Sequence, residues 1–166
     1  MPTRSVLLRL AAPLAFAGCV FGFRGEASVE AIYPLTDIDA IHIDLGPTPL
    51  TILGDEMATG LELKGAWRAV GGTAKVAAEQ ALGPSLVWAP EERFAQLLAV
   101  VPIDLEGQVD FEVDEIRLPP DHDLDLVTRL GDVYVLAVDG NIGVDVDVGH
   151  VEIDGGAGGI AVGMAT

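Results

Sequence analysis

Apolar and polar positions follow a nine-residue cycle through the last third of the chain. Each cycle begins with glycine, and the four cycles read GDVYVLAVD, GNIGVDVDV, GHVEIDGGA and GGIAVGMAT from Gly131, Gly140, Gly149 and Gly158. The third and fifth positions are always valine or isoleucine, and the preceding block keeps this apolar pair as Leu124 and Leu126. Side chains alternate along a strand, so these two positions face the same side. The pattern predicts one short strand per cycle, with glycine at the corner, supplying either a positive φ or a close approach.

Stacking is needed to bury these strands, because a strand of about five residues cannot bury its own apolar face. Two nine-residue arms make an 18-residue turn, since 131–135 resembles 149–153 and 140–144 resembles 158–162. The predicted fold class is mainly β, a short β-solenoid (β-helix-like) built from Gly-x-[VI]-x-[VI] rungs. An antiparallel meander is the alternative for alternating valine and isoleucine. A calcium-binding nonapeptide roll is disfavoured, because the repeat lacks the Gly-Gly-x-Gly-x-Asp sequence.

Upstream of the repeats, the pattern predicts further strands and a small helical insertion. Period-two alternation and turn residues predict strands over 38–45, 50–53, 61–64, 85–88, 96–101 and 109–118. The segment TAKVAAEQAL, residues 73–82, has helical spacing and is followed by Gly83-Pro84 as a stop. No linker separates the β-rich part at 35–120 from the repeat part at 121–166. We therefore expect one continuous body.

The first 18 residues are typical of a secretory signal peptide. They contain no acid, and Arg4 and Arg9 precede a short apolar run over residues 10–17. This run is well short of the roughly 20 residues that span a bilayer. Cleavage after Ala17 would release a soluble chain that begins at Gly18. An uncleaved, cytoplasmic N-terminus is a further alternative.

A second cleavage pattern overlaps the first. Residues 16–19, Phe-Ala-Gly-Cys, resemble a bacterial lipobox, in which Cys19 is acylated and becomes the first residue. The chain has 1 cysteine, which excludes an internal disulfide framework and a multi-cysteine zinc site. Residues 19–34 would then form a tether to the membrane. In lipoprotein terms, Val20 in place of aspartate implies the outer membrane, with a periplasmic or secreted protein as the alternative.

Composition narrows the classes of partner. The 166 residues carry 26 acidic and 9 basic side chains, for a net charge of −17. Coulomb repulsion therefore opposes binding to nucleic acid or to an anionic membrane surface. The mean hydropathy of +0.42 is too apolar for a disordered chain.

Candidate chemistry is sparse. The histidines, His42, His122 and His150, lie far apart in sequence and are expected to face solvent. No zinc-protease, phosphate-loop, dinucleotide or Gly-x-Ser-x-Gly motif is present. Asp145 and Asp147 share a strand face, where paired carboxylates can do acid–base work, but a solvated face is the simpler interpretation. We therefore expect no catalytic residues and no enzyme activity, and a polysaccharide-cleaving β-helix is only a fold analogy.

The strongest candidate site is an acidic cluster, Asp121, Asp123 and Asp125. Carboxylates suit a hard cation such as Ca²⁺, so a Ca²⁺ or small-ligand module is an alternative function. An EF-hand is excluded, because Leu126 occupies the position that requires glycine. Alternating aspartates also keep an outer strand face hydrated and oppose edge-to-edge association.

Three segments resemble the putative-adhesin family of bacterial cell-envelope β-solenoid proteins, a domain of unknown function. They are LGPTPLTI at 45–52, IRLPP at 116–120 and LDLVTRLGDVYV at 124–135, and the resemblance spans residues 35–166. It implies a non-enzymatic envelope protein with an adhesin-like or structural role, without cofactor or catalytic residues. The last block, GGIAVGMAT, has no charge and no polar cap, so we expect this rung to contact another copy or a protein partner.

Overall fold

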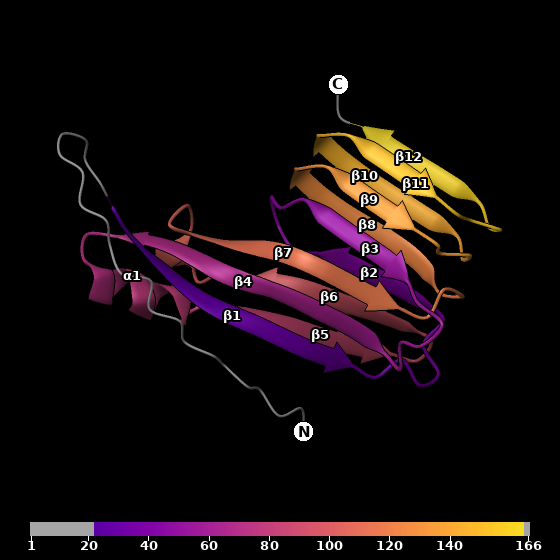
Figure 1. The fold of residues 1–166 in the computed structure, drawn as a ribbon, viewed down its shortest axis with the longest axis horizontal. Helices are drawn as coiled ribbons and strands as arrows, with labels where there is room; N and C mark the ends of the chain where they lie inside the picture. The colour runs from indigo at the N-terminus through magenta and orange to yellow at the C-terminus, as the bar shows by residue number, and fades with distance from the viewer. Residues whose placement is uncertain (1–21, 165–166) are drawn as a thin grey trace.

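The computed structural model describes residues 22–164 as two six-stranded β-sheets with one α-helix (Figure 1). In spatial order, the first sheet contains β1 (Phe23–Tyr33), β4 (Leu61–Gly71), β7 (Val109–Leu118), β3 (Leu50–Gly54), β9 (Val133–Leu136) and β11 (Val151–Asp154). The second sheet contains β12 (Ile160–Met164), β10 (Ile142–Val148), β8 (Asp123–Leu130), β2 (Ala40–Asp44), β6 (Phe94–Val100) and β5 (Ser85–Glu91). The helices are α1 (Ala74–Ala81) and the 3₁₀ turn η1 (Ile103–Leu105). The fold is mainly β, as predicted.

The strands of the C-terminal third pair in parallel, and their partners lie 18 residues apart. Ile142 of β10 lies opposite Leu124 of β8 on one side and opposite Ile160 of β12 on the other. In the first sheet, Val133 of β9 lies opposite Val151 of β11. This parallel register shows that the alternative of an antiparallel meander is wrong for these strands. The earlier strands β2 and β3 join the same series, since β2 pairs with β8 and β3 pairs with β9.

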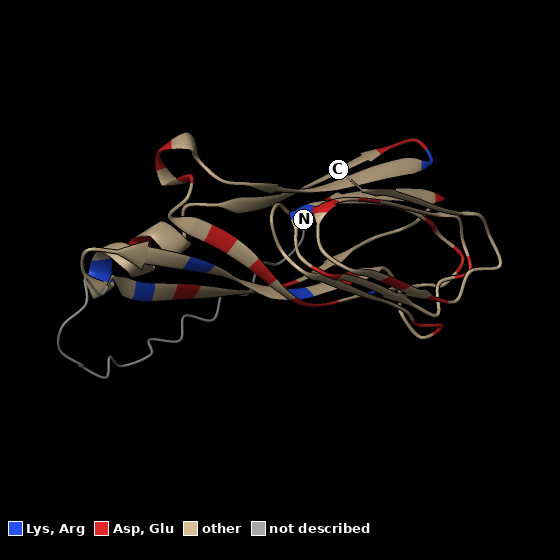
Figure 2. Ribbon diagram, turned by 90° about the horizontal axis from the view of Figure 1, so that it is seen from above, with Lys and Arg blue, Asp and Glu red and all other residues tan. Residues whose placement is uncertain are grey.

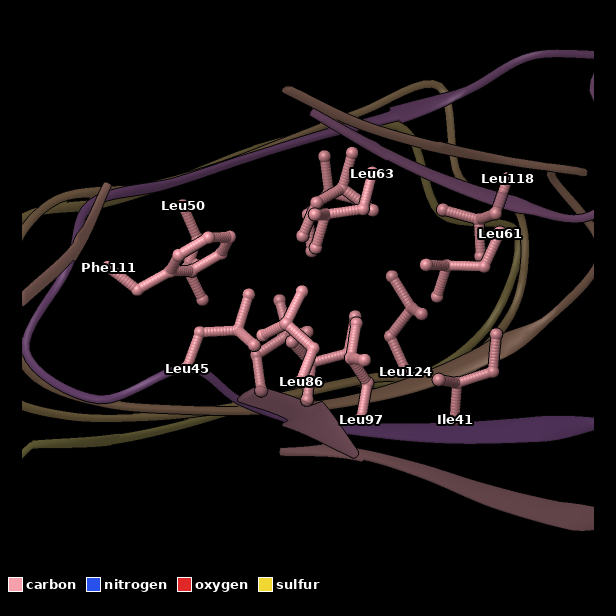
Figure 3. Packing of buried hydrophobic residues seen from close by; sticks show 14 of the residues in the cluster. Ile41, Leu45, Leu50, Leu61, Leu63, Leu86, Leu97, Phe111, Leu118 and Leu124 are labelled. Atoms are coloured by element: carbon pink, nitrogen blue, oxygen red, sulfur yellow. The ribbon is translucent and has the colours of Figure 1, made fainter. Parts of the chain in front are cut away.

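The apolar pairs of the repeat belong to the core between the two sheets. Figure 3 shows part of this core, including Leu124. Each residue of these pairs is at most 3% exposed in the three blocks that start at residues 122, 131 and 140. These side chains are Leu124, Leu126, Val133, Val135, Ile142 and Val144. The cluster also takes in buried residues from β3, β4, β6 and β7, so the parts 35–120 and 121–166 share one core. Burying an aliphatic side chain of this size stabilises the fold by about 1.5–3 kcal/mol.

Stacked corners explain the period-nine glycines. A Cβ added at Gly140 would lie 2.1 Å from the carbonyl oxygen of His122, and one at Gly149 would lie 2.0 Å from the carbonyl oxygen of Gly131. A Cβ at Gly158 would lie 2.6 Å from the Gly140 carbonyl oxygen. Each contact joins residues 18 apart, so each corner rests on the backbone of the corner one turn earlier. Of the four repeat glycines, Gly131 alone has a positive φ, of 139°.

The other half of the body is antiparallel and carries the helix. β4 lies between β1 and β7 and is antiparallel to both, and β5 and β6 form an antiparallel pair. The Oγ1 atom of Thr73 accepts a hydrogen bond from the Val76 backbone N–H, 3.2 Å away, and caps α1. The helix packs on β1 at Gly25, where a Cβ would lie 2.2 Å from the Ala77 carbonyl oxygen. The predicted helix at 73–82 is confirmed.

Residues 23–33 form strand β1, so the prediction of a tether over residues 19–34 is wrong for this part of the segment. Its 11 residues pair with β4 along their whole length, from Phe23 opposite Gly71 to Tyr33 opposite Leu61. Burial of apolar surface favours this pairing, because Ala27 packs in the core and is 3% exposed. Residues 1–21, and with them the signal peptide and the lipidation residue Cys19, lie outside the described residues.

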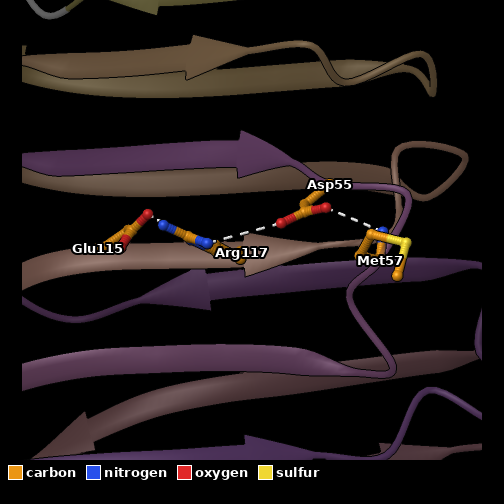
Figure 4. A network of polar contacts seen from close by, with 4 residues as sticks. All are labelled: Asp55, Met57, Glu115 and Arg117. Atoms are coloured by element: carbon orange, nitrogen blue, oxygen red, sulfur yellow. Dashed lines mark hydrogen bonds and ion pairs between the residues drawn. The ribbon is translucent and has the colours of Figure 1, made fainter.

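An exposed polar network joins the turn after β3 to strand β7 (Figure 4). Arg117 lies between Glu115, which accepts a hydrogen bond from Nε, and Asp55, whose Oδ2 is 3.6 Å from Nη1. Asp55 Oδ1 also accepts a hydrogen bond from the Met57 backbone N–H at 2.9 Å. Solvent screens such pairs, so they orient the turn more than they stabilise it.

Candidate functional site

The acidic cluster is divided among three partners. Asp123 Oδ1 accepts hydrogen bonds from the Asn141 backbone N–H at 2.7 Å and from the Asn141 side chain at 3.0 Å. Asp125 Oδ2 lies 2.8 Å from His42 Nδ1, whereas Asp121 Oδ1 lies 3.1 Å from His122 Nδ1. Within residues 22–164, no three histidine, cysteine or carboxylate side chains are grouped to hold a metal ion. Binding of Ca²⁺ at Asp121, Asp123 and Asp125 stays a prediction.

The Asp123 contact belongs to a series that we call the corner ladder. It consists of the second residue of successive blocks, namely Asp123, Asp132, Asn141, His150 and Gly159. In each step, a side-chain oxygen accepts a hydrogen bond from the backbone N–H of the residue 18 positions later. Asn141 Oδ1 accepts from Gly159 at 2.9 Å, and Asp132 Oδ1 accepts from His150 at 2.9 Å. The ladder satisfies backbone donors at the corners, which is a structural role for these polar residues.

The corner ladder predicts a pH effect at Asp123. Hydrogen bonds from the backbone and the side chain of Asn141 lower the pKa of Asp123. The ionised carboxylate therefore stabilises the fold above the pKa of the unfolded chain, about 3.9, and this stabilisation is lost as the pH falls through the lower pKa of the folded state. We expect Asp123→Asn to lower the melting temperature at neutral pH by about 2–4 °C, which corresponds to about 1 kcal/mol in a solvated site.

Thermal scans over the acid range measure this effect. The difference between the parent chain and Asp123→Asn should vanish once Asp123 is protonated in the folded state. Asp147→Asn removes an exposed carboxylate outside the ladder and controls for the change in net charge. A constant difference at every pH would show that the charge of Asp123 does not contribute.

The three histidines have different surroundings. His42 lies on the outer face of β2, as predicted, and pairs with Asp125. The expectation of solvent exposure is wrong for His122, which is 9% exposed. Its position shares the inward face of Leu124 and Leu126, and its Nδ1 lies 3.3 Å from the Pro119 carbonyl oxygen. His150 is exposed at a corner.

A cavity of about 120 Å³ lies between β1, the end of α1 and the start of β5. Mostly apolar residues line it, among them Ala27, Ala31, Tyr33, Trp67, Leu82 and Leu86. The Tyr33 ring stacks on Trp88, with their centroids 5.0 Å apart. Ser28 and Ser85 also line the cavity, but its lining includes no histidine to act as their base. Its walls therefore hold no serine–histidine pair.

The end of the body farthest from this cavity in the strand order exposes apolar side chains of the repeat. Strands β11 and β12 are the edge strands of the two sheets there, at the yellow end of Figure 1. Ile160 and Val162 occupy the same register as the buried Ile142 and Val144, yet they are 50% and 47% exposed. Met164, at the end of β12, is 58% exposed. We call this surface, formed by β11 and β12, the open end.

Charge is unevenly distributed around the open end. Acidic positions are spread over the strands and corners of the body, and basic positions are few (Figure 2). Strand β11 carries Glu152 and Asp154, whereas β12 carries no charged residue. An uncharged and apolar strand on a chain of net charge −17 repels another acidic protein less than the acidic strands do.

The comparisons with known proteins show a limited likeness. No family model matches the chain, and a search of curated proteins gives no significant match. Among solved structures, the chain is similar to a crystal structure described as a "putative cell adhesion protein" from Clostridium sporogenes, with 13% identity and a TM-score of 0.38. The match covers 78% of this chain and 57% of that one, so this chain spans little more than half of its length. Within residues 22–164, no helix is long and apolar enough to cross a membrane.

Proposed function

We propose that this chain is a non-enzymatic protein of the bacterial cell envelope, with an adhesin-like or structural interaction role. The observation that carries the proposal is the regular stacking of parallel strands, which pair every 18 residues in both sheets: β8 with β10 and β10 with β12, and β9 with β11. This stacking supports a short β-solenoid as the body of the protein. Solenoid proteins use their extended faces as binding surfaces.

We further propose that the chain is exported and anchored by a lipid on Cys19. The support for the anchor is the lipobox-like sequence of residues 16–19. Strand β1 begins at Phe23, and four residues of chain span at most about 13 Å. Because β1 and β11 are the opposite edges of the first sheet, an anchor at Cys19 would leave the open end facing away from the membrane. The outer membrane is the proposed location, and a soluble periplasmic or secreted form is the alternative.

The mature N-terminus tests this proposal. The protein is purified from the membrane fraction of its native cells, and its N-terminal peptide is weighed by mass spectrometry. We expect a peptide that begins at an acylated Cys19, and Cys19→Ser is expected to move the protein into the soluble fraction. An unmodified peptide that begins at Gly18 would leave an exported protein without an anchor. An intact Met1 with Arg4 present would overturn the envelope assignment.

A further inference from the structure

The cavity beside β1 follows the edge of that strand. Its lining takes in the consecutive residues 27–31 of β1 and residues 84–86 at the start of β5. Because neighbouring residues of a strand point to opposite faces, a cavity lined by such a run follows the edge of the strand and not one face. β1 and β5 are edge strands of the two sheets (Figure 1). The cavity therefore lies in the gap between two sheet edges.

Small side chains on the inward face of β1 leave this space open. The helix α1 packs on β1 at Gly25, and at the other end of the strand Tyr33 stacks on Trp88. Between these two contacts, the inward positions include Ala27 and Ala31. Packed sheets stand about 10 Å apart, a distance that two methyl side chains do not fill. The result is the cavity of about 120 Å³.

We propose that this cavity is a binding site for an extended peptide segment of another protein. The segment adds as a strand to the free edge of β1 and inserts one large apolar side chain into the cavity. In this mode of recognition, backbone hydrogen bonds supply affinity and the side-chain pocket supplies specificity. The inference goes beyond the proposed envelope role and does not depend on an anchor at Cys19.

The size and chemistry of the cavity fit one apolar side chain. An apolar cavity of roughly 150 Å³ binds a benzene ring, so a cavity of about 120 Å³ has room for one side chain such as leucine or phenylalanine. Trp67 and Leu86 in its wall are 4% and 8% exposed, so the inserted group would meet core residues. Residues 27–31 span about 13 Å, and in an added strand of that length only alternate side chains point inward.

The edge of β1 is suited to strand addition. Within residues 22–164, β1 pairs with β4 and with no other strand, so one row of its backbone N–H and C=O groups has no strand partner. No proline interrupts residues 27–31, and each of them has an N–H group. The edge of β5 is less suited, because Pro84 precedes the strand and Pro90 lies within it, and neither has an N–H to donate.

Charge favours a basic segment over an acidic one. The chain has 26 acidic and 9 basic residues, and its field attracts cationic partners. Among the described residues that line the cavity, the charged one is Glu30, which is exposed at the rim. Lysine or arginine residues beside the inserted side chain would therefore speed association and strengthen binding at low salt.

Titration with a synthetic peptide tests the proposal. The exported chain carrying Cys19→Ser is used with the peptide Lys-Thr-Val-Phe-Val-Thr-Lys, which spans about 23 Å as a strand. The chain has 2 tryptophans, and both report on the cavity, since Trp67 lines it and Trp88 stacks on Tyr33. We expect saturable changes in tryptophan fluorescence. A peptide with alanine at its centre should bind about tenfold more weakly or less well still, and glutamate in place of both lysines should also weaken binding.

Two variants on neighbouring residues of β1 locate the site. Ala31→Phe fills the cavity from within and is expected to weaken binding of the phenylalanine-centred peptide by about tenfold or more. Ile32→Phe adds an aromatic ring at the next residue, which is 59% exposed and points to the opposite face, and should bind like the parent chain. Cooperative thermal unfolding checks that both variants fold, and the alanine-centred peptide tests the cavity without altering the protein. Equal binding by the two variants would overturn the site.

Backbone methylation of the peptide distinguishes strand addition from insertion of a side chain alone. Only alternate residues of an added strand donate hydrogen bonds to the edge that it joins. We expect N-methylation of one alternate set of peptide residues to abolish binding and N-methylation of the other set to preserve it. Equal effects of the two sets would overturn strand addition.

The remaining outcomes separate this site from the proposed function. No binding by peptides centred on phenylalanine, leucine or methionine would overturn the site, and with an acylated Cys19 in the native protein it would leave the envelope role standing. A fluorescence change with toluene but with none of these peptides would replace the peptide by a small apolar ligand. Peptide binding by a protein whose native N-terminus is an intact Met1 would overturn the envelope role alone.

Discussion

Replacing Gly140 with alanine is expected to destabilise the protein by about 3 kcal/mol, near the upper end of the cost of overpacking a close contact. The added Cβ would lie 2.1 Å from the carbonyl oxygen of His122 and 2.4 Å from its carbonyl carbon. Both are backbone atoms of the corner one turn earlier, so no side-chain rotation can relieve the clash. The corners must separate, which also strains the bond from Asn141 to Asp123 in the corner ladder.

Urea unfolding measures this loss, and Gly143→Ala is the matched control. Gly143 lies in β10 three residues later, and the nearest atom to its added Cβ would be Asp125 Oδ1 at 3.3 Å, with the Leu124 carbonyl oxygen in ordinary contact at 3.7 Å. A carboxylate end can move by a few tenths of an ångström, so we expect a change within about 0.5 kcal/mol for the control. The melting temperature of Gly140→Ala should fall by about 6–12 °C. Equal stabilities of the two variants would show that the corners do not stack closely.

Replacing Ile142 with alanine is expected to cost about 3 kcal/mol, within the range for a fully buried aliphatic side chain. Ile142 is 1% exposed and lies between Leu124 of β8 and Ile160 of β12. The truncated side chain would leave a cavity that neighbouring strands cannot close, because their register is held on both sides. Ile160→Ala is the control: it removes the same atoms from the same repeat position, but Ile160 is 50% exposed, and we expect about 1 kcal/mol or less.

The two isoleucine variants are compared by denaturant unfolding at the same protein concentration. Ile142→Ala should lose more stability than Ile160→Ala, because only Ile142 is fully buried. Equal losses for the two variants would contradict the difference in burial between them.

Much of the local structure could be predicted from the order of the residues. Alternation predicted the strands of the repeat and their inward pairs, such as Val133 and Val135, which are fully buried. The helix was predicted from its own residues, because Thr73 caps its start and Gly83-Pro84 follows its end. These signals are local, since the alternation of side chains along a strand and the satisfaction of the first N–H groups of a helix depend on neighbouring residues.

The candidate site was less predictable. The sequence offered Asp121, Asp123 and Asp125 as an alternative cation cluster, and it did not indicate that they contact His122, Asn141 and His42, respectively. Polar residues that directly follow the repeat glycines, such as Asp132 and Asn141, were the available signal for the corner ladder. They are informative only once the 18-residue stacking is known, because each accepts from a backbone group in the next turn.

The sequence by itself determined which residues form strands, which of them face inward, and that one strand near the end carries no charge. Tertiary structure decided which of these strands have a neighbour. It drew 23–33 into the first sheet as β1, and it buried Ile142 while leaving Ile160, at the same position of the repeat, half exposed. The physical reason is that alternation is set within one strand, whereas burial requires a second strand to cover it, and that strand lies a full turn away along the chain.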